Sequence, residues 1–334
     1  MWSDQPFDTR LKLKLDMLAS PTRDNLLGDY LSARRYVTEE IVKNIPRSEP
    51  DLTDHSEAHL ADVMRRICDL IGSDDSYLSP HEFYLLGISV LFHDVGNLHG
   101  RKEHNKKIAD IYNAARNNED RFHTERNAVL SIAGAHTGST MSGNEDTVKN
   151  VTILTFDGSR IRGQELAALL RLGDELAEGP HRTSAYLLNH HSYKPENVIY
   201  HRYASSVEHR IDRVDGRIAI TYTLDLELKN GNLEVGNGIK IDDMLRFCYA
   251  RIVKLDLERR YCKFYSNMLS VFKETSAYFN FYHEGHPLDF EIEPIVISDI
   301  VIPGDAIKTI EERYESYGIE HLVSALSQEC GRNL

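Results

Sequence analysis

One segment constrains the fold of this chain more than any other: between Phe83 and Phe92 almost every side chain is apolar. The preceding Ser79-Pro80-His81-Glu82 is a capping box with proline at the first helical position, so a helix is predicted to begin there. An apolar run without a polar face indicates a helix that is buried on all sides. The run leads directly into His93-Asp94, so two polar side chains are expected at the end of a buried helix.

The segments around this run predict further helices. Apolar residues recur at intervals of three and four over 11–45, with a break at Ser20-Pro21. Residues 53–71 form one apolar stripe, which Thr53 or Asp54 can cap and Gly72 can end. Helices are also predicted over 103–117, 122–134 and 161–177, a loop over 138–150, and one short extended stretch at Val151–Phe156. The first part of the chain is therefore predicted to be an all-α bundle.

The pattern changes near residues 190–197. Alternating and β-branched residues predict strands over Val198–Tyr203, Val207–Val214 and Arg217–Leu228, with a hairpin turn at Asp215-Gly216. A long helical region over Asp242–Phe281, a strand over Phe290–Ile302 and a helix over Ile307–Leu326 are predicted to follow. We therefore predict a mainly α fold: a helical domain over 1–192 and a smaller α+β domain over 193–334 with a regulatory, substrate-closing or oligomerising role.

Composition restricts the class of partner. The formal net charge is −13, and an acidic chain repels nucleic-acid backbones, so sequence-independent nucleic-acid binding is not expected. A metal ion and a few local cations can still hold a small phosphorylated substrate. The N-terminus lacks the features of a signal peptide, and no apolar stretch approaches the roughly 18 residues of a membrane span. We expect a cytoplasmic location and no membrane partner, and a homo-oligomer is compatible with the sequence.

Histidines gather in one part of the chain. Eight of the sixteen lie between His55 and His136, many of them where helices are predicted to begin or end. An imidazole and a carboxylate side by side, as in His93-Asp94, can bind one metal ion from the same side, and this pair suits Mn, Fe, Ni, Zn or Mg. None of the four cysteines forms a C-x-x-C pair, so a zinc-finger site is not predicted.

Two further segments supply partners for the His93-Asp94 pair. His55 is expected at the start of a helix, and it is the preferred ligand over His59, which lies one turn further on the same face and is interpreted as a surface residue. Asp174 lies within the leucine-rich run 169–176, where a buried carboxylate would be costly without a cation. The alternative for Asp174 is a solvated position on an amphipathic helix.

The chain carries His55, His93-Asp94 and Asp174 in this order on a predicted helical scaffold. This pattern resembles the HD superfamily of metal-dependent phosphohydrolases. The resemblance extends over about residues 50–180, and family members often carry a run similar to 169–176 at their last Asp. The HD domains of bacterial nucleotide-signalling and defence systems are the most similar group. The resemblance implies that these four residues ligate a divalent metal and that an activated water attacks phosphorus.

Several HD proteins hold two metal ions, with extra histidine ligands between the HD pair and the last Asp. His104 and His136 occupy matching stretches here, either as ligands of a second metal or in contact with substrate. Asp94 would bridge the two ions if both are bound. Either His99 or His104 can serve as proton donor to the leaving oxygen. The resemblance thus implies one or two divalent ions per chain.

Phosphate groups need cations beyond the metal. Arg101, Lys102 and Lys106 follow the HD pair, and Arg171 lies three residues before Asp174 on the same helical face. Each of these cations can instead be a solvated surface charge. Three functions remain open at this point: a (deoxy)nucleoside triphosphohydrolase or nucleotidase, a phosphodiesterase of a cyclic or linear signalling nucleotide, and a non-hydrolytic nucleotide sensor.

Overall fold

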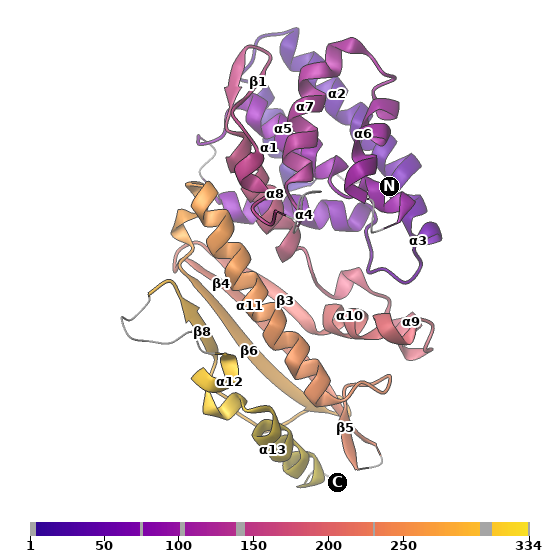
Figure 1. Ribbon diagram of the computed structural model, residues 1–334, viewed down its shortest axis with the longest axis vertical. Coiled ribbons are helices and arrows are strands. Elements are labelled where there is room, and N and C mark those ends of the chain that lie inside the picture. The colour runs from indigo at the N-terminus through magenta and orange to yellow at the C-terminus, as the bar shows by residue number, and fades with distance from the viewer. Residues whose placement is uncertain are drawn as a thin grey trace. The chain divides into compact units, whose positions relative to one another are not determined.

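The structure is a computed structural model that describes residues 5–73, 76–100, 104–137, 144–229, 231–300 and 309–332. The chain forms two compact units (Figure 1): unit 1 comprises Met1–Ala177 and Tyr261–Ser270, and unit 2 comprises Glu178–Arg260 and Val271–Leu334. The fold is mainly α with a smaller α+β part towards the C-terminus, as predicted. The domain limits 1–192 and 193–334 stay a prediction.

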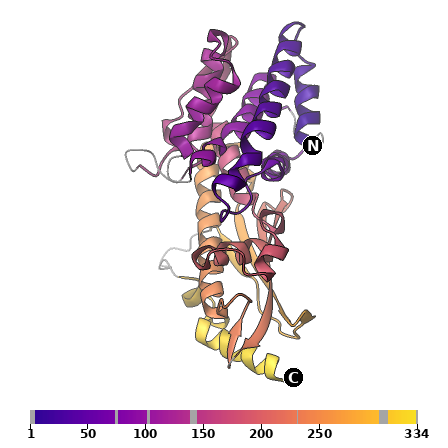
Figure 2. The ribbon, with the colours of Figure 1, turned by 90° about the vertical axis from the view of Figure 1, so that its right-hand side faces the viewer.

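Unit 1 is a helical bundle (Figures 1 and 2). Its helices are α1 (Pro6–Leu15), α2 (Thr22–Tyr36), α3 (Ile45–Ser48), α4 (Glu57–Ile71), α5 (Pro80–Phe92), α6 (His104–Ala115), α7 (His123–Gly134) and α8 (Gly163–Leu176). A short hairpin of β1 (Leu154–Phe156) and β2 (Ser159–Ile161) precedes α8. Within the described residues, no helix of the chain is long and apolar enough to cross a bilayer.

Helix α5 forms the centre of unit 1. It packs against α1, α2, α4, α7 and α8, and every side chain from His81 to Phe92 is buried. The predicted capping box is present, because Ser79 Oγ accepts from the Glu82 backbone N–H and the Glu82 carboxylate accepts from the Ser79 N–H. Gly87 is the point of closest approach, since a Cβ there would lie 2.8 Å from a ring carbon of Phe7. The helix that delivers the HD pair is therefore buried on every side, as the apolar run predicts.

The start of α4 differs from the prediction. Ser56 caps this helix, because its hydroxyl accepts from the Ala58 N–H, whereas Thr53 or Asp54 was expected to do so. The Asp54 carboxylate instead accepts from the Ser56 backbone N–H at 3.0 Å and from its hydroxyl at 2.6 Å. Because of this local turn, α4 begins at Glu57, and His55 lies just before the helix rather than within its first turn.

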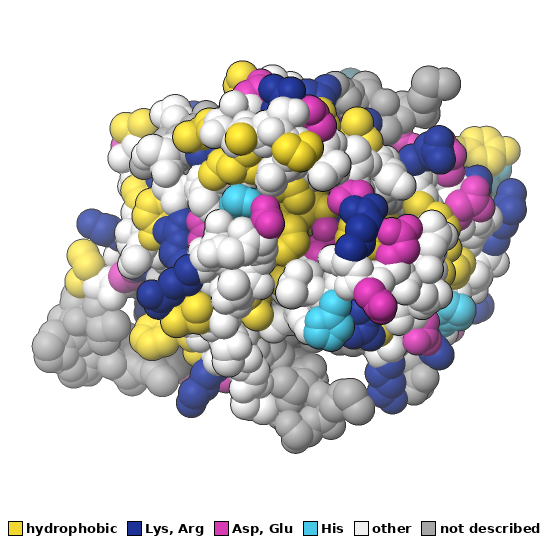
Figure 3. Space-filling view, turned by 90° about the horizontal axis from the view of Figure 1, so that it is seen from above, with side chains coloured by type: hydrophobic (Ala, Val, Ile, Leu, Met, Phe, Trp, Pro, Cys, Tyr) yellow, Lys and Arg dark blue, Asp and Glu magenta, His cyan; other side chains and the backbone are white. Residues whose placement is uncertain are grey.

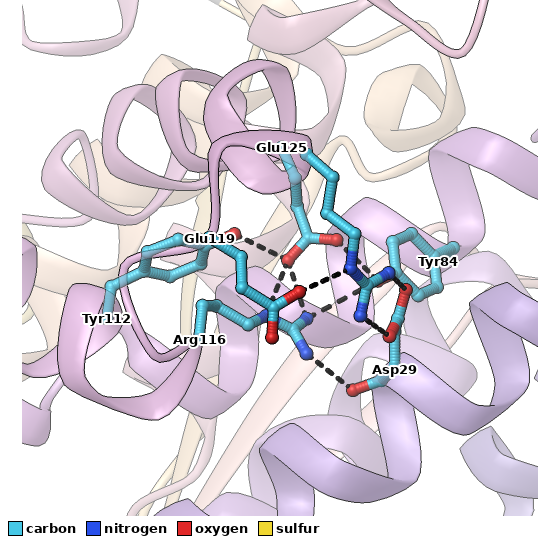
Figure 4. Close-up of polar contacts among 7 residues, drawn as sticks. Asp29, Tyr84, Tyr112, Arg116, Glu119 and Glu125 are labelled. Carbon is cyan, nitrogen blue, oxygen red and sulfur yellow. Dashed lines mark hydrogen bonds and ion pairs between the residues drawn. The ribbon is translucent and has the colours of Figure 1, made fainter.

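A buried polar network joins four helices of unit 1 at the end of α5 that lies away from the HD pair (Figure 4). The Glu125 carboxylate of α7 accepts from Arg116 Nε at 3.0 Å and from the hydroxyls of Tyr84 and Tyr112, each at 2.5 Å. Arg116 Nη1 also donates to the Asp29 backbone carbonyl of α2 at 2.7 Å. Three partners, Tyr84, Tyr112 and the Asp29 carbonyl, thus complete the hydrogen bonding of this charged pair within an apolar bundle.

A surface pocket lies beside this network in unit 1. Its lining includes Asn25, Asp29, Arg121, Glu125 and Phe156. Figure 3 shows one face of the molecule, on which hydrophobic side chains line a furrow bordered by acidic and basic side chains. The charges of the pocket are paired within the protein, because Arg121 bonds both oxygens of Asp29 at 2.9 Å. Among the described residues that line the pocket, the arginine is thus already paired and not available to an anionic ligand.

Unit 2 is built on a mixed sheet. Its strands are β3 (Val207–Asp212), β4 (Arg217–Lys229), β5 (Asn232–Glu234), β6 (Glu274–His283), β7 (His286–Pro287) and β8 (Ile295–Ser298). The order is β3-β4-β6-β7, with β5 also paired to β4 and β8 to β6. The β3–β4 hairpin at Asp215-Gly216 confirms the predicted turn.

Strands β4 and β6 are parallel, from Arg217 opposite Glu274 to Leu226 opposite His283. Parallel neighbours need a crossover, and α11 (Ile241–Tyr265) supplies it along one face of the sheet (Figure 1). The other helices of this unit are α9 (Ala185–Asn189), α10 (Pro195–Ser206), α12 (Ile310–Arg313) and α13 (Ile319–Arg332).

Two predicted elements of this region are wrong. Residues Val198–Tyr203 belong to helix α10 rather than to a strand, since Pro195 opens the helix and its buried Val198, His201 and Ala204 recur every three residues. The predicted helical region Asp242–Phe281 stops at Tyr265, and its last part is strand β6. The predicted strand Phe290–Ile302 is confirmed only over Ile295–Ser298, and its residues 301–302 lie outside the described part of the chain.

Candidate metal centre

The HD pair lies where α5 ends. His93 caps the helix, and Asp94 begins a tight 3₁₀ turn over Val95–His99. Gly96 in this turn touches the start of α6, because a Cβ there would lie 1.8 Å from the carbonyl oxygen of His104. Only glycine allows this contact, which brings the first residue of α6 next to the HD pair.

Backbone carbonyls orient three imidazoles of the centre. His93 Nδ1 lies 2.7 Å from the Val90 carbonyl oxygen, and His55 Nδ1 lies 2.5 Å from that of Thr53. His136 Nδ1 makes the same kind of contact with the carbonyl of Ala133. A carbonyl can only accept, so each Nδ1 carries the hydrogen and each Nε2 is left as a potential ligand atom. Metal-ligating histidines are held in this way in many proteins.

A first donor group consists of His59, His93, Asp94 and Asp174, whose ligand atoms all lie within 4.8 Å of one another. Asp174 Oδ1 lies 3.2 Å from His59 Nε2 and 3.5 Å from His93 Nε2. Asp94 Oδ2 lies 3.4 Å from His93 Nε2. His55 adjoins the group, with its Nε2 at 3.7 Å from the same Asp94 oxygen. Helices α4, α5 and α8 therefore meet at this point.

A second donor group consists of Asp94, His104 and His136. The other oxygen of Asp94, Oδ1, lies 3.5 Å from His136 Nε2. The rings of His104 and His136 are 5.7 Å apart, and His136 stands perpendicular to His93 at 5.1 Å. The two oxygens of Asp94 thus face different donor groups, an arrangement that suits a carboxylate bridging two metal ions.

A divalent cation fits the first donor group. His93 Nε2 is wholly buried and makes no hydrogen bond, although two carboxylate oxygens lie near it. Ligand atoms at about 2.0–2.2 Å from a common ion lie roughly 3–3.5 Å apart, close to the separations seen here. Nitrogen and carboxylate donors together suit Mn, Fe, Ni, Zn or Mg. The buried His/Asp cluster can therefore hold a divalent metal.

Both carboxylates favour the ionised form. Burial opposes ionisation of Asp94, but the neighbouring imidazoles of His93, His136 and His55 outweigh it and hold the pKa of Asp94 well below its usual range. Burial likewise opposes ionisation of Asp174, but the neighbouring imidazoles of His59 and His93 outweigh it and hold the pKa of Asp174 well below its usual range. Two negative charges thus persist in a buried place, which is the electrostatic condition for binding a cation.

The structure brings together all six residues proposed as ligands from the sequence: His55, His93, Asp94, His104, His136 and Asp174. The interpretation of His59 as a surface residue is wrong, because this side chain is 0% exposed and belongs to the first donor group. The signal in the sequence was the spacing of four residues between His55 and His59, which places both on the same face of a helix. The later start of α4 explains the difference, since it places His59 rather than His55 in the first turn of the helix.

Among the described residues, His99, Lys106 and Arg171 belong to neither donor group. His99 ends the 3₁₀ turn and is exposed, and Lys106 is exposed on α6. Arg101 and Lys102 lie outside the described residues. Arg171 is buried, and its Nη1 donates to the Thr137 carbonyl at 2.7 Å. A contact between any of these five residues and substrate stays a proposal.

The sequence model of the HD-CE family matches residues 49–233, which is more than half of the chain. The chain belongs to the HD-CE family. The HD-CE match includes every residue of both donor groups and continues through β3 and β4, well beyond the end of the predicted resemblance near residue 180. No curated protein and no solved structure matches the chain. An HD-type domain with a buried His/Asp cluster indicates a metal-dependent hydrolase at this coarse level.

Proposed function

We propose that this HD-CE protein hydrolyses phosphoester or phosphoanhydride bonds in nucleotides, first of all as a (deoxy)nucleoside triphosphohydrolase or nucleotidase. The observation that supports this is the meeting of imidazole and carboxylate donors in two groups that share Asp94. One or two divalent ions bound there would supply Lewis acidity, for activating water and for offsetting charge on phosphoryl oxygens. The chain supplies the ligands, their orientation and the proton transfers.

Preorganisation is the first contribution of the chain. Backbone carbonyls fix the rings of His55, His93 and His136, so these groups need no rearrangement before reaction. The Asp94 carboxylate is the proposed acceptor for the proton of the attacking water. His99 is the proposed donor to the leaving oxygen, because His104, the alternative, already belongs to the second donor group.

Substrate phosphates need cations near the donor groups. Lys106, exposed on the first turn of α6, is a proposed phosphate contact, together with Arg101 and Lys102. His136 remains an alternative substrate contact, although its Nε2 faces Asp94. The geometry of Arg171 favours a different role, because its Nη1 already donates to protein oxygens.

A phosphodiesterase of a cyclic or linear signalling nucleotide is the second candidate. The second donor group favours it, since a pair of ions can stabilise both the attacking and the leaving oxygen of a diester. The third possibility is a non-hydrolytic nucleotide sensor. A complete set of metal donors argues against it, because binding alone does not require them all.

A substrate screen tests these alternatives. The full chain, stripped of metal and supplied with Mn²⁺, is incubated with nucleoside triphosphates, monophosphates and cyclic or linear dinucleotides, and products are separated by chromatography. Inorganic triphosphate or phosphate supports the first candidate, and a mononucleotide from a dinucleotide supports the second. Turnover of no nucleotide by protein that holds Mn²⁺ would contradict both and support the sensor.

Asp94→Asn is the matching variant. We expect it to lower metal affinity and turnover by more than about 100-fold, the upper end of what changes outside the ligand shell cause. Asp110→Asn is the matched control, because Asp110 is exposed on α6. Equal turnover in both variants would exclude the Asp94 centre as the source of activity.

A further inference from the structure

The backbone on both sides of His136 is held by a side chain that belongs to neither donor group. The carbonyl oxygens of Ala135 and Thr137 lie 3.5 Å and 2.7 Å from Arg171 Nη1, which donates to them. Arg171 is buried on α8, one turn before Asp174. Helix α8 thus contributes Asp174 to the first donor group and orients, through Arg171, the segment that carries His136 of the second.

Thr147 holds the same segment, and Arg171 and Thr147 together are called the anchor of His136. Its hydroxyl accepts from Arg171 Nη1 at 2.9 Å and lies 2.8 Å from the Ala135 carbonyl oxygen and 3.2 Å from that of Thr137. Thr147 is 4% exposed, so water cannot easily replace these bonds. A buried carbonyl that loses its partner is costly, and the His136 segment would move to recover one.

The C-terminal turn of α11 supports the anchor from the other side. The guanidinium of Arg171 lies 4.7 Å from the ring centre of Tyr261. The Tyr261 hydroxyl accepts from the Val148 backbone N–H at 2.9 Å and donates to Asp146 Oδ1 at 3.0 Å. Tyr265 donates to the same oxygen at 2.7 Å. All these residues belong to unit 1.

We infer that Arg171, Thr147 and Tyr261 are positioning residues for His136, and that they set the affinity of the second donor group for its cation without affecting the first. This inference rests on the proposed metal-dependent function. None of the three residues is a ligand; they act on the direction of His136 Nε2 through the backbone of residues 135–137. Contacts of this kind typically change metal affinity by about 10- to 100-fold.

Mn²⁺ binding to the full chain tests the inference. Equilibrium dialysis with elemental analysis gives the number of ions per chain and the affinity of each class of site. The wild type is expected to bind two ions. Thr147→Val, which keeps the shape but removes the hydroxyl, and Arg171→Met are expected to weaken one class by about 10- to 100-fold and leave the other unchanged. Thr147→Ser restores the hydroxyl and is expected to restore the affinity.

Two further variants distinguish a local effect on the His136 segment from a general loss of structure. Tyr261→Phe keeps the ring below Arg171 but removes the hydroxyl, and is expected to weaken the same class to a smaller extent. Tyr249→Phe is the matched control, because that hydroxyl donates to the Tyr317 carbonyl at 3.0 Å within unit 2. It is expected to bind both ions as the wild type does.

Three results would overturn the inference: a wild type with a single class of ion, anchor variants that retain both classes at full affinity, and anchor variants that lose both classes together. The proposed function can be contradicted independently of the positioning role. A wild type that binds two Mn²⁺ ions and hydrolyses no nucleotide would contradict that function while the positioning role stands. Nucleotide turnover combined with unaltered Mn²⁺ binding in the anchor variants would contradict the positioning role alone.

Discussion

At the scale of single residues, the Glu125 carboxylate is a charge buried within unit 1. It is 2% exposed, and Arg116, Tyr84 and Tyr112 compensate it (Figure 4). Glu125→Gln keeps the shape but leaves the Arg116 guanidinium unpaired, so we expect a loss of about 3–5 kcal/mol in the free energy of unfolding, measured with urea. Glu119→Gln, which removes a carboxylate exposed at the surface, serves as the control. A loss below about 1 kcal/mol for Glu125→Gln would mean that the pair contributes no more than a surface ion pair.

The same scale shows how much of the candidate site a sequence can reveal. His93, Asp94 and Asp174 could be predicted, because polar ligand types within apolar runs need a reason to be buried. His59 could not be separated from His55 by spacing, since the inward residue depends on where α4 begins and the Asp54–Ser56 turn decides that. The anchoring contacts of Arg171 are made with Ala135, Thr137 and Thr147, which are distant in sequence and have no periodic signal.

At the scale of elements, the start of α5 carries a pH-dependent contribution to stability. Burial alone would raise the pKa of Glu82, but hydrogen bonds from Arg162 and from the Ser79 N–H outweigh burial and lower it below its usual 4.5. A folded-state pKa below the unfolded value stabilises the protein above about pH 4.5, and that stability is lost as the pH falls through the folded value. We expect the free energy of unfolding to fall less between pH 5 and pH 3 for Glu82→Gln than for the wild type, in urea titrations at each pH. Parallel losses in the two proteins would contradict this assignment.

The elements also show where sequence patterns succeed. Helix α5 and the β3–β4 hairpin have strong local signals, a capping box with an apolar run and an Asp-Gly turn, and both were predicted. Helix α10 was mistaken for a strand because one position of its buried stripe is His201, which disguises the helical period. Strand β6 was merged with α11 because neither proline nor glycine separates them, and its parallel pairing with β4 is a long-range contact that local patterns cannot show.

At the scale of the whole molecule, every residue of both donor groups belongs to unit 1. A ligand that binds only the folded state stabilises it by about 2.7 kcal/mol at 100 times its Kd, so saturating Mn²⁺ should stabilise unit 1 and leave unit 2 little changed. Hydrogen exchange followed by mass spectrometry distinguishes the two units. We expect slower exchange in α4, α5 and α8 on addition of Mn²⁺, and unchanged exchange in β4 and β6. In Asp94→Asn the effect should disappear, because the carboxylate shared by both donor groups is lost. Protection that rises equally in both units, or that persists in this variant, would show that Mn²⁺ acts elsewhere than at the His/Asp centre.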